Sequence, residues 1–115
     1  MRVFIDANVI ISVFNREYPL YIYSARILSL GSNDRFELFT SPLCLAIAFY
    51  FSSKKSGEKM AKNKMQSLLE NISLTTIDDS VAKHAAGDPR IIDFEDGLEY
   101  YSAIKKSCNI IITED

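Results

Sequence analysis

A run of three apolar residues near the N-terminus, residues 3–5, ends directly in an acidic residue, Asp6. Two of the three are β-branched, and such a short run is typical of a strand buried on both faces of a parallel sheet. Open α/β sheets bind ligands at the carboxyl ends of their strands, so Asp6 lies where a functional group is expected. A carboxylate there needs a cation or hydrogen-bond donors. From these residues alone, capping of the next helix explains Asp6 equally well.

The rest of the chain alternates between segments typical of strands and segments typical of helices. Further strands are expected at residues 36–40, 72–77 and 110–112, and helices at residues 9–14, 19–30, 43–52, 58–71, 79–86 and 93–106. Helices between successive strands predict βαβ units, and therefore an α/β fold with a parallel sheet and helices on both faces. The 115 residues contain no repeat or linker, which predicts a single domain, residues 1–115.

The segment at residues 43–52 is apolar almost all round and follows a strong helix start, Ser41-Pro42. A helix of this kind is predicted to lie at the centre of the core. The next residues, 53–57, are polar and are expected to form a loop.

Composition excludes several classes of protein. No apolar run approaches the roughly 20 residues of a membrane span, and the N-terminus lacks a secretory signal, so a cytoplasmic protein without membrane association is predicted. Cys44 and Cys108 are far apart in apolar contexts and are expected to be reduced core residues. His84 is the only histidine, which argues against a Cys/His zinc site. A formal net charge of −2 argues against bulk coating of nucleic acid.

Acidic residues from three separate segments are predicted to meet at one edge of the sheet. Asp6 and Asp115 follow two apolar strands, and Asp93, Glu95 and Asp96 begin the helix that leads into the last strand. Carboxylates packed together repel one another unless a cation neutralises them, and oxygen ligands of this kind suit Mg²⁺ or Mn²⁺. Such ions promote phosphodiester hydrolysis. The predicted chemistry is therefore metal-dependent cleavage of a phosphodiester.

Simpler explanations exist for each acid taken alone. Asp93 is suited to be an N-cap and Asp96 to be its first-turn partner. Glu95 and Glu99 are expected to be solvated, and Asp115 stands at a terminus, where chains often fray. Only their convergence favours a metal site.

Three motifs together resemble those of the PIN-domain family, in particular its VapC-like branch from bacterial toxin–antitoxin pairs. They are Asp-Ala-Asn at residues 6–8, Asp-Phe-Glu-Asp-Gly-Leu-Glu-Tyr-Tyr-Ser-Ala at residues 93–103, and Ile-Ile-Ile-Thr-Glu-Asp at residues 110–115. The resemblance implies an α/β/α sandwich and an endoribonuclease that depends on Mg²⁺ or Mn²⁺ and hydrolyses RNA with a metal-activated water. It also implies an antitoxin partner and a homodimer.

The resemblance also implies roles for individual residues. Asp6, Asp96 and Asp115 match the acids that bind metal and perform catalysis. Asn8 would orient the site and Thr113 would support the last acid. Three further acids could assist as auxiliary groups: Asp93, Glu95 and Glu99.

Two departures from the family pattern leave a second hypothesis open. Most members carry a further acid, usually glutamate, on the helix after the second strand, where this chain has Ile47. Members also continue past the final acid to an edge strand, whereas this sequence stops at Asp115, which predicts a sheet of about four strands. The chain is therefore either a ribonuclease or a PIN-fold protein with weak or lost activity that acts as a binding or regulatory partner.

Two other functions for an aspartate after an apolar strand are less well supported. Aspartyl-phosphate phosphatases need a second aspartate two residues on, and this chain has Asn8 there. A receiver-type phospho-acceptor is disfavoured as well, because it normally needs an acidic pair before its acceptor strand and a lysine after a later strand.

Overall fold

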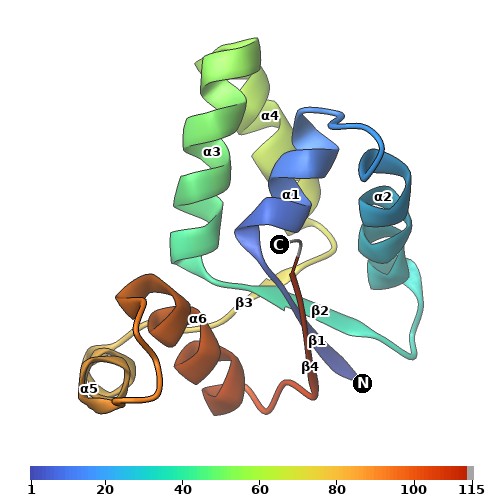
Figure 1. Cartoon of the computed structure of the whole chain (residues 1–115). Coiled ribbons are helices and arrows are strands. Elements are labelled where there is room, and N and C mark those ends of the chain that lie inside the picture. Colours follow the sequence, from blue (N-terminus) through green and yellow to red (C-terminus); the bar gives the residue numbers. More distant parts are fainter. Residues whose placement is uncertain (114–115) are drawn as a thin grey trace.

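The computed structural model describes residues 1–113, and four strands in this range form one parallel sheet in the order β3-β2-β1-β4 (Figure 1). The strands are β1 (Arg2–Ile5), β2 (Glu37–Thr40), β3 (Ser73–Leu74) and β4 (Ile110–Ile112). Phe4 of β1 is paired with Phe39 on one side and Ile111 on the other. The predicted α/β class and parallel sheet of about four strands are confirmed.

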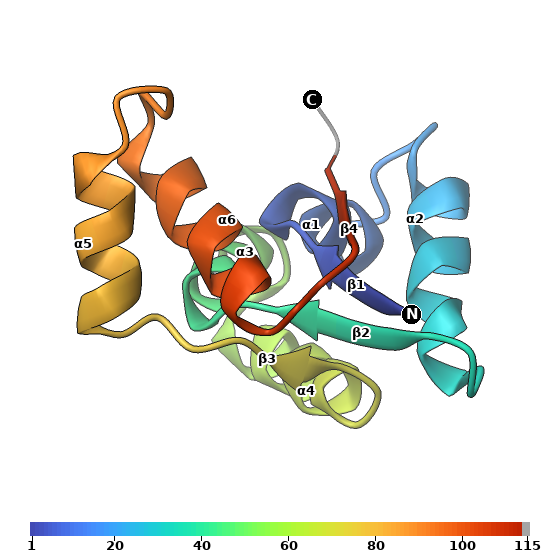
Figure 2. The same ribbon diagram turned by 90° about the horizontal axis from the view of Figure 1, so that it is seen from below.

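Six helices and one 3₁₀ turn flank the sheet within these residues. They are α1 (Ala7–Phe14), α2 (Tyr21–Ser29), η1 (Leu30–Ser32), α3 (Pro42–Ser56), α4 (Glu58–Leu69), α5 (Asp79–Gly87) and α6 (Phe94–Lys105). Helices α5 and α6 pack as a pair on one side of the molecule, and α2 lies on the opposite side (Figure 2). Strand β1 runs between these groups of helices.

Strand β1 is the centre of the core. Val3, Phe4 and Ile5 are at most 2% exposed, as expected for a strand covered on both faces. Val9 and Ile10 of α1 are fully buried beside it. Because β1 is held between β2 and β4, the position of Asp6 at its carboxyl end is fixed by the most buried part of the chain.

Both expectations for α3 are wrong. The helix continues to Ser56, through the residues expected to form a loop, because the first residue to leave helical geometry is Gly57, with φ +86°. Only a narrow stripe of small residues, Cys44, Ala48 and Ser52, is buried. Tyr50 and Phe51 are about half exposed, so α3 lies at the periphery of the core rather than at its centre. The small residues every four positions form the face that packs inward.

The expected strand at residues 72–77 is also too long. Strand β3 has only Ser73 and Leu74, and after it Thr75 donates one further backbone hydrogen bond to Thr40, at 2.8 Å. Thr75 then turns its hydroxyl toward Ser102 of α6, at 3.0 Å, and the chain leaves the sheet.

The start of α3 depends on one buried hydroxyl. Ser41 Oγ accepts a hydrogen bond from the backbone N–H of Cys44 at 3.0 Å, and Ser41 is fully buried. Ser41→Ala is expected to destabilise the protein by about 0.5–2 kcal/mol, because the orphaned N–H is left without its cap. Urea unfolding would measure this loss. Ser53→Ala, at a partly exposed position of the same helix, is the matched control, and equal stabilities of the two variants would contradict the capping role.

Candidate functional site

Asp6 serves two roles. Its Oδ1 accepts a hydrogen bond from the backbone N–H of Ala7 at 2.7 Å, which caps α1, and its Oδ2 accepts one from Thr113 Oγ1 at 2.8 Å. The backbone N–H of Asp6 donates to the carbonyl of Ile112 at 2.9 Å. Capping and placement at the sheet edge are therefore compatible, and both oxygens of the carboxylate are oriented by donors from different segments.

A pocket of about 310 Å³ opens at this edge of the sheet. Six of the residues predicted from the sequence line it: Asp6, Asn8, Glu95, Asp96, Glu99 and Thr113. Asp93 is the N-cap of α6, where its Oδ1 accepts from the backbone N–H of Glu95 at 2.9 Å. Asp115 lies outside the described residues. The structure thus gathers the described acids from β1 and α6, and gives Asp93 the capping role.

Glu99 is more deeply buried in the site than the sequence predicted. It was expected to be solvated, yet it is only 9% exposed, whereas Glu95 is exposed as expected. Glu99 lies one turn further along α6 than Asp96, on the same helix face, where Cys44 and Asp6 pack against its carboxyl group. The i, i+3 spacing of two acids was the signal in the sequence, but the direction of α6 relative to the sheet was needed to interpret it.

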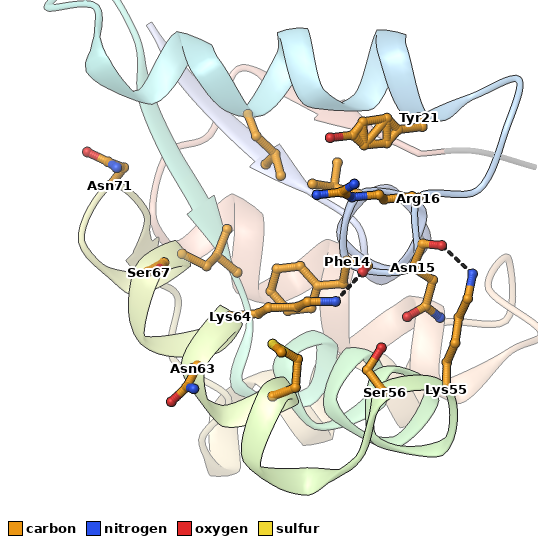
Figure 3. Close-up of a pocket in the computed structure, with 14 residues that line it drawn as sticks. Phe14, Asn15, Arg16, Tyr21, Lys55, Ser56, Asn63, Lys64, Ser67 and Asn71 are labelled. Atoms are coloured by element: carbon orange, nitrogen blue, oxygen red, sulfur yellow. Dashed lines mark hydrogen bonds between the residues drawn. The ribbon is translucent and has the colours of Figure 1, made fainter.

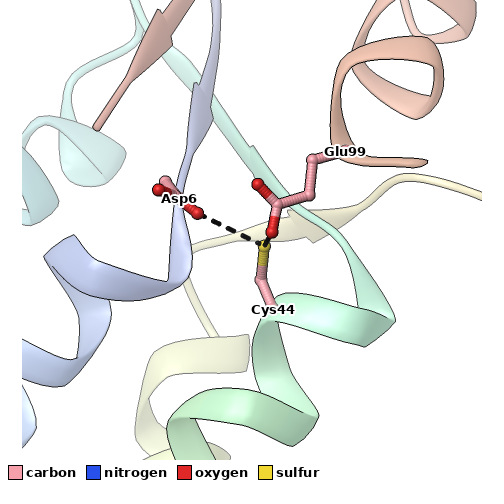
Figure 4. A group of neighbouring side chains, drawn as sticks. All are labelled: Asp6, Cys44 and Glu99. Atoms are coloured by element: carbon pink, nitrogen blue, oxygen red, sulfur yellow. Dashed lines mark hydrogen bonds between the residues drawn. The ribbon is translucent and has the colours of Figure 1, made fainter. Parts of the chain in front are cut away.

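The thiol of Cys44 lies between the carboxyl groups of Asp6 and Glu99 (Figure 4). Its Sγ donates a hydrogen bond to Glu99 Oε1 at 3.2 Å and lies 4.0 Å from Asp6 Oδ1. One ligand atom from each of the three residues lies within 4.8 Å of the others. Cys44 is fully buried, as predicted for a core cysteine, but it lies directly against the acids of the site.

The electrostatics of this cluster favour protonated groups. Burial, followed by the nearby charges of Asp6 and Asp96, raises the pKa of Glu99 to about 8. Burial and the charge of Glu99 raise the pKa of the Cys44 thiol to about 12. Partial desolvation of its carboxyl group and the charges of Asp93, Asp96 and Asp6 also raise the pKa of the exposed Glu95. Crowded acids therefore repel one another here, and a cation would relieve this repulsion.

The donor set of the pocket fits a divalent cation. Among residues 1–113, neither Asp6 nor Glu99 forms an ion pair with lysine or arginine. The wall of the pocket formed by α3 contributes Ile47, which has no donor atom, as expected from the sequence. The described ligands for a metal thus come from the end of β1 and from α6, with a sulfur atom from α3.

A second, larger pocket of about 880 Å³ lies between the end of α1, α2 and α4 (Figure 3). Lys64 Nζ donates to the carbonyl of Phe14 at 2.5 Å, and Lys55 Nζ donates to the carbonyl of Asn15. Two lysines, one from α3 and one from α4, therefore satisfy carbonyls at the C-terminal end of α1. With Arg16 they give a cationic rim to a pocket lined by both apolar and neutral polar side chains.

No helix within residues 1–113 is long and apolar enough to span a bilayer.

Comparison with known proteins identifies relatives of this chain. Residues 2–115 match a family model described as a PIN domain. Ribonuclease VapC1 of Aquifex aeolicus is 27% identical over 117 residues, which cover 99% of this chain and 81% of that protein.

Two solved structures share the fold. One is VapC20 of Mycobacterium tuberculosis, a toxin that cleaves the sarcin–ricin loop, with a TM-score of 0.77 and 15% identity over 98% of this chain and 89% of that chain. The other is VapBC2 of Rickettsia felis bound to a fragment of its promoter DNA, with a TM-score of 0.71 and 16% identity over 99% of this chain and 88% of that chain.

Proposed function

This chain belongs to the PIN-domain family, in its VapC-like branch, and from that premise we propose that it is a metal-dependent endoribonuclease of a toxin–antitoxin pair. The observation that carries the proposal is the pocket at the carboxyl edge of the sheet, where Asp6, Asp96 and Glu99 converge from two elements. The curated relative that matches nearly the whole chain is a ribonuclease.

Asp6 and Asp96, with Asp115 as the third acid of the motif, are the residues we assign to metal binding and catalysis. These carboxylates would hold a divalent ion such as Mg²⁺ or Mn²⁺, which would supply activation of a water for attack and neutralisation of charge on the phosphodiester. Glu99 of α6 adds a further carboxylate to the pocket, whose α3 wall contributes only Ile47.

The chain's own groups fix the direction of Asp6. Two donors, the Ala7 N–H and the Thr113 hydroxyl, bind its two oxygens separately, so the carboxylate has little freedom to rotate. Asn8, the residue after Ala7 in α1, lines the same pocket. We assign Thr113 and Asn8 to positioning, because the orienting partners of ligands control metal affinity.

A second candidate is a PIN-fold protein with weak or lost cleavage that acts as a binding or regulatory partner. Ile47 favours it, because the pocket wall at this position offers no ligand. The two candidates share the fold and differ in whether RNA is cut.

Cleavage of a labelled single-stranded RNA by the purified chain separates the two. We expect cleavage in Mn²⁺ or Mg²⁺, its loss in excess EDTA, and its return when the ion is restored, because the carboxylates alone offer no electrophile. Equal cleavage in EDTA would contradict the metal requirement. Absence of cleavage at every concentration of either ion would favour the second candidate.

We also propose that an antitoxin protein binds this chain in the cytoplasm. The VapC-like branch comes from toxin–antitoxin pairs, and the larger pocket here combines apolar side chains with the cationic rim of Arg16, Lys55 and Lys64. Such a surface suits an acidic, amphipathic segment of a partner. The RNA substrate and the homodimer remain predictions from the family.

A further inference from the structure

The site contains a sulfur atom to which the proposed ribonuclease mechanism gives no role. We propose that Asp6, Glu99 and Cys44 together form a binding site for a thiophilic divalent cation of the class of Zn²⁺ or Co²⁺. The inference rests on the proposed function only in that the PIN-type pocket is taken as a metal site. It differs from the family pattern in both the sulfur ligand and the use of Glu99.

The spacing of the three side chains suits such an ion. With a metal–sulfur distance of about 2.3 Å and a metal–oxygen distance of about 2.0 Å, tetrahedral ligands lie about 3.5 Å apart. The Cys44 sulfur lies 3.2 Å from the nearer oxygen of Glu99 and 4.0 Å from that of Asp6. The two sulfur–oxygen separations bracket the tetrahedral value, and all three ligand atoms lie within 4.8 Å of one another, so an ion can be held once the two carboxyl groups close on it.

The elements that supply the ligands are rigidly held. Asp6 ends the most buried strand, and Cys44 is in the first turn of α3, where Ser41 caps its backbone N–H. Glu99 is in the middle of α6, with only 9% of its surface exposed. A site built on two helices and a strand is more precise than one built on loops.

The chemistry of the donors distinguishes this ion from Mg²⁺. Thiolates select soft or borderline metals, whereas Mg²⁺ prefers an octahedral shell of oxygen atoms. Asp6 and Glu99 line the open pocket and the Cys44 sulfur lies behind them, so three protein ligands leave a fourth position toward solvent. An open fourth position is typical of catalytic rather than structural zinc sites.

Cobalt spectroscopy on the full chain tests the proposal without measuring activity. Titration with Co²⁺ is expected to give a sulfur-to-metal charge-transfer band in the near ultraviolet. The band should disappear in Cys44→Ser and persist in Cys108→Ser, because Cys108 is the only other cysteine. Glu99→Gln should weaken Co²⁺ binding at least tenfold. X-ray absorption of the zinc-loaded wild-type protein should show one sulfur at about 2.3 Å.

A wild-type protein without the band and without the zinc–sulfur distance overturns the proposal, whatever the variants do. A band that survives in well-folded Cys44→Ser also overturns it. The result is independent of the proposed function. Cleavage of RNA without a sulfur–metal signal would support the ribonuclease proposal and overturn the Zn²⁺/Co²⁺ site. A sulfur–metal signal without cleavage would support the site and contradict the ribonuclease proposal.

Discussion

Asp6→Asn is expected to lower RNA cleavage by at least about a hundredfold. Loss of partners that only orient a metal ligand typically lowers affinity or activity 10–100-fold, and Asp6 is assigned to the metal itself. Asparagine keeps the shape of the side chain and is as good an N-cap as aspartate, so the hydrogen bond from Ala7 N is retained. The expected loss is therefore one of activity, with the melting temperature nearly unchanged.

The measurement is the initial rate of cleavage at saturating metal for the variant and wild type. Asp34→Asn is the matched control, because Asp34 is an exposed aspartate before β2, at the opposite edge of the sheet. Full activity of the Asp34 variant with loss in the Asp6 variant supports the assigned site. Comparable rates for the Asp6 variant and wild type would show that the pocket is not where RNA is cut.

The metal-free protein is expected to lose stability as the pH rises from about 5 to about 8. The pKa of Glu99 is raised from 4.5 in the unfolded chain to about 8 in the folded protein, chiefly by burial. Between these values the folded state binds more protons than the unfolded state, so the free energy of unfolding falls with pH. A shift of this size corresponds to a few kcal/mol across the interval.

Thermal melts in EDTA from pH 5 to pH 9 would measure this slope. Glu99→Gln should flatten it, because the amide remains neutral and keeps the shape of the side chain. Glu70→Gln, at an exposed glutamate that ends α4, should leave the slope as in wild type. A slope that is unchanged in Glu99→Gln would assign the pH dependence to another group.

The sequence predicted the parts of the fold that depend on local pattern. The apolar run ending in Asp6 identified the central strand, and the acids at the start of α6 identified the edge where it meets the sheet. Both are set by residue order along single elements. Roles that depend on how elements face one another could not be obtained this way.

Glu99 and α3 show that limit. A glutamate in an acidic helix is usually solvated, and Glu99 is buried in the pocket only because α6 approaches Asp6. In α3, large apolar residues occur on every side, so pattern alone does not say which face is buried. The side with Cys44, Ala48 and Ser52 is the buried one, because small side chains allow neighbouring elements to approach closely. The same packing places the Cys44 thiol beside the carboxyl groups of Asp6 and Glu99.

The hydrogen bond from Thr113 to Asp6 joins residues 107 positions apart. During synthesis, Asp6 leaves the ribosome early, while β4 and Thr113 emerge near the end of the described chain. Contacts of such long sequence separation form late, because loop closure must precede them. A nascent chain therefore cannot orient Asp6 as in the folded protein until almost all of residues 1–113 are available. Assembly of the sheet edge that carries Asp6 is thereby delayed until translation of this region is nearly complete.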